Sequence, residues 1–192
     1  MELHKIGIKL FAEESKRVSL DEFIPLFHRW IQEDLLEDTL VDVTNYSHVF
    51  AGPGTLLIAH EGTYGYDESG GRRGLIYYNK HKLNGSLPDR LVTIGRRALQ
   101  ACQLIERSDE LKNRIRFPGG ELLLFSNDRL AAPNTEETYQ TMRPDLEIFL
   151  ERLCPGGAYE IERAADPRER FALTVKVAEA AEIDEMLTRL SA

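Results

Sequence analysis

Hydrophobic and polar residues alternate in several short segments of the chain, and this alternation predicts β-strands. Within residues 4–11, Ile6, Ile8 and Leu10 fall on one face of an extended segment, because successive side chains of a strand point to opposite sides. Other segments are rich in the aliphatic, aromatic and β-branched residues that favour strands. We expect further strands at residues 40–46, 55–60, 74–78, 121–125, 159–163 and 171–177.

Apolar residues at helical spacing predict four amphipathic helices among these strands. Residues 19–22, Ser-Leu-Asp-Glu, form a capping-box pattern for the first helix. Ser86 is the expected N-cap of the longest helix, and Asn134 that of the third, which Pro144 should divide. The fourth helix is expected near residues 183–190. The stripe of the longest helix is Leu87, Leu91, Ile94, Ala98, Ala101, Cys102 and Ile105.

The order of these elements indicates an α+β fold. Residues 4–107 should form a strand, a helix, three strands and a helix, and residues 121–191 a strand, a helix, two strands and a helix. We expect a mixed or antiparallel sheet, or two such sheets, with the helices packed on one face. The chain should be a single compact unit, 1–192, in which residues 1–116 and 117–192 are two similar, ferredoxin-like halves.

Composition and charge narrow the classes of protein to consider. The chain has 192 residues, 42% of them hydrophobic, which is enough for a substantial core. With 24 basic and 32 acidic residues, its net charge is −8, and this argues against a nucleic-acid or anionic-membrane surface. We therefore expect no nucleic-acid partner and no membrane association.

The sequence also favours a cytoplasmic protein without a cofactor. No apolar run approaches the length of a membrane span, and the first twenty residues lack the apolar core of a secretory signal. Cys102 and Cys154 are expected to be buried thiols in a reducing compartment. No Walker pattern is present, and no Gly-x-Gly-x-x-Gly leads from a strand into a helix, so no nucleotide cofactor is expected.

The candidate functional residues concentrate in residues 39–82, which contain three of the five histidines. His48 precedes the sharp corner Gly52-Pro53-Gly54, where exposed backbone N–H groups can bind an anion. Arg72 and Arg73 would add positive charge beside it. The alternative is a tight loop that only joins two strands.

Two interpretations of this stretch follow. The first is a binding or interaction module for a small molecule or a protein partner, or a homodimer, without chemistry of its own. The second is an enzyme acting on a small anionic metabolite, with His60 as general acid or base and Glu61 or Asp42 orienting it. In the enzyme, Tyr46 would join His60 and Glu61 as a catalytic residue that donates a hydrogen bond. Tyr78 would donate another to the ligand, and Arg72 or Arg73 would hold its carboxylate or phosphate.

A third interpretation is a metal site. Two imidazoles and one carboxylate make a credible ligand set for zinc or another transition metal. His48 and His60, together with Asp42 or Asp67, would supply these ligands. Their spacing matches no specific metal motif, so this set remains an alternative to the other two interpretations.

Overall fold

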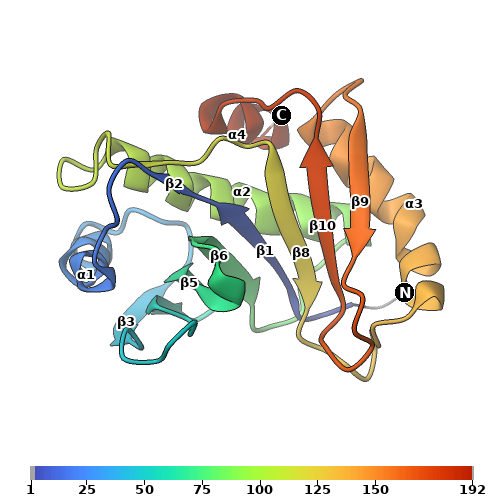
Figure 1. The fold of residues 1–192 in the computed structure, drawn as a ribbon, viewed down its shortest axis with the longest axis horizontal. Helices are drawn as coiled ribbons and strands as arrows, with labels where there is room; N and C mark the ends of the chain where they lie inside the picture. Colours follow the sequence, from blue (N-terminus) through green and yellow to red (C-terminus); the bar gives the residue numbers. More distant parts are fainter. Residues whose placement is uncertain (1–2, 192) are drawn as a thin grey trace.

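A computed structural model describes residues 3–191 as an eight-stranded antiparallel sheet with four helices packed against it (Figure 1). The strands of the sheet, in spatial order, are β3 (Leu40–Asn45), β4 (Thr55–Ala59), β5 (Gly62–Asp67), β6 (Gly74–Asn79), β1 (Ile6–Phe11), β8 (Glu121–Ser126), β10 (Ala172–Val177) and β9 (Tyr159–Arg163). The helices are α1 (Phe23–Glu33), α2 (Leu87–Arg107), α3 (Glu136–Leu153) and α4 (Ile183–Ser191). Two 3-10 turns, η1 (Leu20–Glu22) and η2 (Ser69–Gly71), and a short ribbon of β2 (Glu13–Glu14) and β7 (Ile115–Arg116) complete the fold.

The predicted α+β class is confirmed, but two ferredoxin-like halves are not shown. Strand β1 pairs with β6 on one side and with β8 on the other, so residues from both sides of the expected boundary at 116 share one sheet. All the strand pairs described are antiparallel. Hairpins join neighbouring strands, whereas α1, α2 and α3 each connect two strands that are not neighbours in the sheet.

The main hydrophobic core lies between the sheet and the four helices. Ile8 and Leu10 of β1 point into it, as the alternation predicts, and both are buried. The Phe23 ring of α1 stacks on Tyr66 of β5, with ring centroids 4.1 Å apart. The predicted stripe of α2 is also buried, including Cys102, which is a free thiol like Cys154. Burial of each large apolar side chain stabilises the fold by about 1.5–3 kcal/mol. We call this side of the sheet the helix-covered face.

Helix ends follow the predicted caps in two cases out of three. Ser86 and Asp89 form a capping box at α2, and Ser19 forms one with Glu22, although the first turn there is the 3-10 turn η1. In α3 the N-cap is Thr135, and the amide of Asn134 instead donates to the carbonyl oxygens of Ala164 and Asp166.

Pro144 does not divide α3, contrary to the sequence prediction. The helix runs without a break from Glu136 to Leu153. Proline removes one backbone donor and crowds the preceding turn. Met142 and Leu146 on either side of it are both buried in the core, and this packing holds the two turns in one helix.

Strand β5 was not predicted from the sequence. Its segment Gly-Thr-Tyr-Gly-Tyr-Asp contains two glycines and no aliphatic residue, and glycine is depleted in strand interiors. The glycines have a packing role, because a Cβ at Gly62 would meet the Tyr77 ring and one at Gly65 would meet Leu56. As a result, His60 and Glu61 occupy a two-residue turn between β4 and β5 rather than the end of a longer strand.

The opposite side of the sheet, which we call the open face, carries a small second cluster of buried apolar residues. Ile76, Phe125 and Ala172 form this cluster, with Tyr78 and Leu123 packed against it. A buried ion pair between Lys9 and Asp67 lies on the same face. The open face is therefore built from a mixture of apolar and charged side chains.

Both edges of the sheet carry features that discourage pairing with another chain. Edge strand β3 has a bulge between Leu40 and Asp42, and the Asp42 carboxylate accepts a hydrogen bond from the Val43 backbone N–H at 2.8 Å. Edge strand β9 carries Glu160 and Glu162, both exposed. Such devices protect edge strands. The expected homodimer stays a prediction, and these edges do not favour it. None of the helices within residues 3–191 is both long and apolar enough to span a membrane.

Candidate functional site

The structure places His60 and Glu61 in the turn between β4 and β5. His60 is exposed, and its ring lies 5.0 Å from that of His81, measured between centroids. The Glu61 carboxylate accepts hydrogen bonds from the Thr39 backbone N–H at 2.8 Å and from the Thr39 hydroxyl at 3.2 Å. Glu61 therefore anchors the segment before β3 and is directed to Thr39, while His60 faces solvent. The general acid or base role stays a prediction.

Tyr46, His48, Gly52 and Gly54 lie in the connection from β3 to β4, at the opposite end of β4 from His60. The Gly52 N–H donates to the Val49 carbonyl within the loop, so it is not directed to a ligand. Gly54 has a φ of +68°, and a Cβ there would clash with a neighbouring backbone carbonyl. The corner therefore serves a close approach between two segments of backbone.

Arg72 and Arg73, expected to hold an anion, are engaged by carboxylates of the chain itself. Arg72 donates two hydrogen bonds to Glu121, at 2.6 and 2.8 Å. Arg73 pairs with Glu14 and Glu68, both at 3.0 Å. Tyr78 is half-buried on the open face, where it lies opposite Thr63 of β5. The predicted residues are thus distributed over three regions and do not form one site.

The metal alternative is not supported among residues 3–191, where no three His, Cys, Asp or Glu side chains are grouped so that they could hold a metal ion. His48 and His60 lie at opposite ends of β4, and Asp67 is paired with Lys9. The sequence prediction failed here because closeness along the chain says little about distance once a strand separates two residues.

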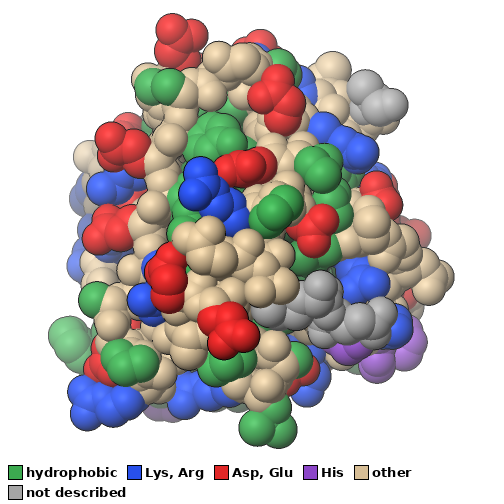
Figure 2. Space-filling view, turned by 90° about the vertical axis from the view of Figure 1, so that its right-hand side faces the viewer, with side chains coloured by type: hydrophobic (Ala, Val, Ile, Leu, Met, Phe, Trp, Pro, Cys, Tyr) green, Lys and Arg blue, Asp and Glu red, His purple; other side chains and the backbone are tan. Residues whose placement is uncertain are grey.

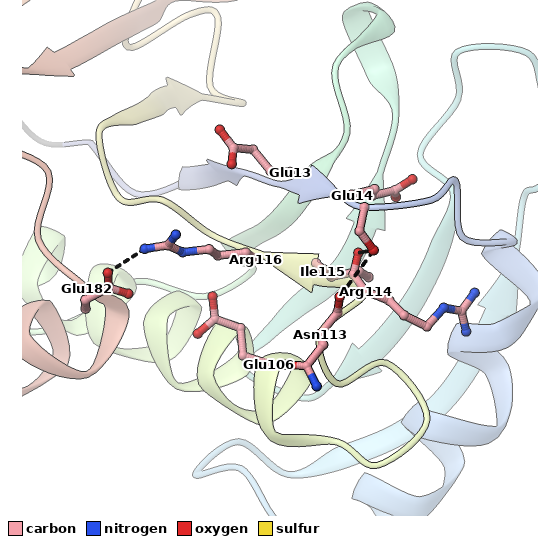
Figure 3. A pocket seen from close by; sticks show the side chains of 9 residues that line it. Glu13, Glu14, Glu106, Asn113, Arg114, Ile115, Arg116 and Glu182 are labelled. Atoms are coloured by element: carbon pink, nitrogen blue, oxygen red, sulfur yellow. Dashed lines mark hydrogen bonds and ion pairs between the residues drawn. The ribbon is translucent and has the colours of Figure 1, made fainter.

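A different region has the form of a ligand site. A cavity of about 510 Å³ lies between the β2–β7 ribbon, the C-terminal end of α2 and the residue that precedes α4 (Figure 3). We call it the rim pocket. Its charged lining residues are Glu13, Glu14, Glu106, Arg114, Arg116 and Glu182. The volume is within the usual range for small-molecule sites.

Most of these charges have partners. The Glu14 carboxylate accepts hydrogen bonds from Arg73 at 3.0 Å and from the Tyr66 hydroxyl at 2.7 Å. Arg116 pairs with Glu182 at 2.5 Å across the pocket. The third pair joins Arg114 to Glu22 of the η1 turn, and Figure 3 shows the Arg114 side chain directed away from Glu106.

Glu106 is the exception among the partly buried residues of the pocket. One oxygen of its carboxyl group accepts a hydrogen bond from the Phe117 backbone N–H at 2.7 Å, and no cation within residues 3–191 pairs with it. Burial raises the pKa of Glu106, and the negative charges of Glu182 and Asp184 raise it further, while the Phe117 N–H and the charge of Arg116 oppose the shift. Figure 3 shows this side chain rising from α2 into the space beneath the ribbon. An ionised Glu106 is therefore a half-buried negative charge without an ion-pair partner among the described residues.

A second buried polar group, around Asp38, has a structural role. The Asp38 carboxylate accepts a hydrogen bond from the Tyr77 hydroxyl at 2.9 Å, and its other oxygen lies 2.9 Å from Nε of Arg97. Burial raises the pKa of Asp38, and Arg97 and Tyr77 oppose that shift. These contacts fasten the connection before β3 to both β6 and α2. Because Asp38 is almost completely buried, we assign the group to stability.

The outer surface offers no comparable concentration of one charge in the region drawn in Figure 2. There, on the side of the molecule at the β9 edge, Lys and Arg side chains are interspersed with Asp and Glu, and hydrophobic side chains lie between them. The rim pocket differs because four of its six charged lining residues are acidic.

Sequence analysis missed the rim pocket for a physical reason. The ribbon pairs Glu13 with Arg116 and Glu14 with Ile115, residues about a hundred positions apart. No local sequence pattern predicts such a long-range contact. One signal was present. Glu106 follows Cys102 by four residues, so it lies on the buried side of α2, where an acidic residue is unexpected.

Comparison with known proteins offers no assignment for the rim pocket. Its acidic and basic residues must therefore be interpreted from their own contacts, exposure and charge. No protein-family model, no curated protein and no solved structure matches this chain.

Proposed function

We propose that this protein binds a small organic cation, an amine or a guanidinium compound, in the rim pocket, and that Glu106 holds the positive group. The observation that carries the proposal is the Glu106 carboxyl group, which is partly removed from water and paired with no cation among the described residues. A buried charge without a partner is costly, and a ligand of opposite charge removes that cost.

The charges around Glu106 also favour a cation. Glu13 and Glu106 are the two lining carboxylates without an ion-pair partner in the part of the chain that the structure describes, whereas both lining arginines are paired. An anionic ligand would have to displace Glu22 or Glu182 from an arginine. A cation needs no such exchange, because it meets carboxylates that are already available.

Calorimetric titration at pH 7.5 and low ionic strength tests the proposal. The probes are n-butylamine, n-butylguanidine and 1,4-diaminobutane, with n-butanol as the neutral control. We expect saturable binding of the cations and none of the alcohol. Glu106→Gln keeps an oxygen for the Phe117 N–H but removes the charge, and it should weaken binding at least tenfold, or about 1.4 kcal/mol.

Glu160→Gln is the matched control, since it makes the same change in net charge at an exposed position of β9, outside the rim pocket. This variant should bind the cations as the wild type does. Equal losses in the two variants would mean that the cations respond only to overall charge, and undiminished binding by Glu106→Gln would refute the role of this carboxylate.

A further inference from the structure

The open face of the sheet carries two arginines whose guanidinium groups lie over aromatic rings. The guanidinium carbon of Arg72 is 3.6 Å from the ring centroid of Phe11, and that of Arg170 is 3.7 Å from the centroid of Phe125. Stacking of this kind fixes the plane of a guanidinium group and leaves its N–H edges free for acceptors in that plane.

The two stacks differ in what meets those edges. Arg72 donates two hydrogen bonds to the two oxygens of Glu121, a bidentate carboxylate pair. Arg170 donates from Nη1 to the neutral side-chain oxygen of Asn127 at 3.2 Å, and no carboxylate within residues 3–191 lies at ion-pair distance from it. The guanidinium group of Arg72 is therefore bonded to a carboxylate of the protein itself, whereas that of Arg170 can still accept a carboxylate as partner.

Arg170 is also partly removed from water without a compensating anion. Its side chain is half-buried, and desolvation lowers the pKa of Arg170. The carboxylate with the largest effect on its pKa is Asp67, and this group is already bonded to Lys9 and to the Ser69 hydroxyl. The cation therefore lacks the partner that a desolvated charge requires.

We propose that Arg170 and Phe125 form a binding site for the carboxylate of a small organic acid, which takes the position at Arg170 that Glu121 takes at Arg72. Nε and Nη2 donate two parallel hydrogen bonds to the carboxylate, because Nη1 is held by Asn127. The organic part of the acid lies against Tyr78, a half-buried residue packed on the apolar cluster of the open face. This places Tyr78, selected from the sequence as a ligand contact, beside the site.

A carboxylate fits this site better than a phosphate. On the open face, Lys9 is neutralised by Asp67 and Arg72 by Glu121. The exposed Lys176 lies opposite Glu121 in the neighbouring strand, so Arg170 is the half-buried cation of this face without a carboxylate at ion-pair distance within residues 3–191. One planar donor edge with one positive charge matches a planar anion of charge −1. A phosphate carries more charge and more acceptor oxygens than this edge can serve.

NMR of the arginine side chains tests this site without any variant. The Nε–Hε signals of Arg170 and Arg72 are followed while acetate or benzoate replaces chloride at constant ionic strength. We expect the Arg170 signal to shift saturably, at lower concentration for benzoate than for acetate, because the benzoate ring also contacts the half-buried Tyr78. Arg72, bonded to Glu121, is the internal control and should not shift.

Arg170→Lys identifies the signal and removes the planar donor edge while keeping the charge, so it should weaken benzoate binding at least tenfold. Arg168→Lys is its control, since Arg168 is exposed and paired with Asp166. Shifts of Arg170 and Arg72 that grow together and never saturate would overturn the site. Benzoate binding that Arg170→Lys leaves unchanged would overturn it as well.

Discussion

Asp67 on the open face and Glu106 in the rim pocket are both acidic residues taken partly or wholly out of water, but only Asp67 is compensated. Lys9 bonds to Asp67 and also donates to the carbonyl oxygens of Ser69 at 3.2 Å and Arg72 at 2.6 Å, so every donor of its ammonium group has an acceptor. Glu106 has a single backbone N–H as its partner.

This difference separates a structural charge from a functional one. A closed, fully bonded pair such as Lys9–Asp67 has no capacity for a further ligand, and removing one member leaves the other stranded. A carboxyl group with a raised pKa at the wall of a cavity is poised to gain from a ligand of opposite charge. The same contrast distinguishes Arg72, which is paired with Glu121, from Arg170.

The largest predicted effect is on the compensated pair. Lys9→Met should destabilise the protein by about 3–5 kcal/mol, because it leaves the buried carboxylate of Asp67 without its cation. The double variant Lys9→Met/Asp67→Leu should recover most of that loss, since neither charge remains. Urea unfolding measures both. If the single variant is as stable as the wild type, the pair is not buried as described.

The second prediction compares neighbouring residues of β8 on the two faces of the sheet. Leu124 is buried on the helix-covered face, and Leu124→Ala should cost about 2–5 kcal/mol through lost burial and a cavity. Leu123 is half-buried on the open face, and Leu123→Ala should cost only about 1 kcal/mol. Equal losses in urea unfolding would show that the open face is covered as completely as the other.

The smallest effect has the opposite sign. Glu106→Gln should stabilise the unliganded protein at pH 7 by about 0.5–1 kcal/mol, or roughly 1–4 °C in melting temperature, because it removes a half-buried charge without an ion-pair partner among the described residues and keeps the bond to Phe117. Lys9→Met gives the comparison, because it removes the cation that pairs with Asp67 and should therefore lower stability. A lower melting temperature for Glu106→Gln would mean that the wild-type carboxylate is already compensated.

The pH dependence of this gain follows from the raised pKa of Glu106. The folded state holds the proton more tightly than the unfolded chain, whose glutamate titrates near the ordinary value of 4.5. Below that value Glu106 is protonated in both the folded and the unfolded state, so the difference in stability between the wild type and Glu106→Gln should not change with pH. As the pH rises through the folded pKa, the wild type loses stability relative to Glu106→Gln, and above it the difference should be constant. Thermal melts from pH 4 to 8 test this course.

Local patterns predicted most of the fold. The alternation at Ile6, Ile8 and Leu10, the stripe of α2 and the cap at Ser86 all have physical causes that act over a few residues, and the structure contains each of them. The predictions failed in segments where tertiary packing overrides the local preferences of the residues. β5 relies on its neighbours to accept two glycines, and α3 continues through Pro144 because Met142 and Leu146 are held in the core.

The functional residues were harder to predict because they meet through long-range contacts. Sequence analysis selected polar residues that are close along the chain, such as His48 and His60, and a strand keeps these apart. The rim pocket and the Arg170–Phe125 stack each join segments distant in sequence. Of the residues selected for ligand contact, Tyr78 lies beside a site that we now propose.

The most direct test of the account is a titration of the Glu106 carboxyl carbon, followed by NMR in protein labelled at glutamate and assigned with Glu106→Gln. Without ligand, the midpoint should lie above the ordinary value of 4.5, since burial and the neighbouring carboxylates oppose ionisation. With saturating n-butylguanidine it should move to lower pH, because the bound cation favours the ionised form. A midpoint at the ordinary value, or one that the cation leaves unchanged, would contradict the assignment of Glu106 as an uncompensated, ligand-binding carboxylate.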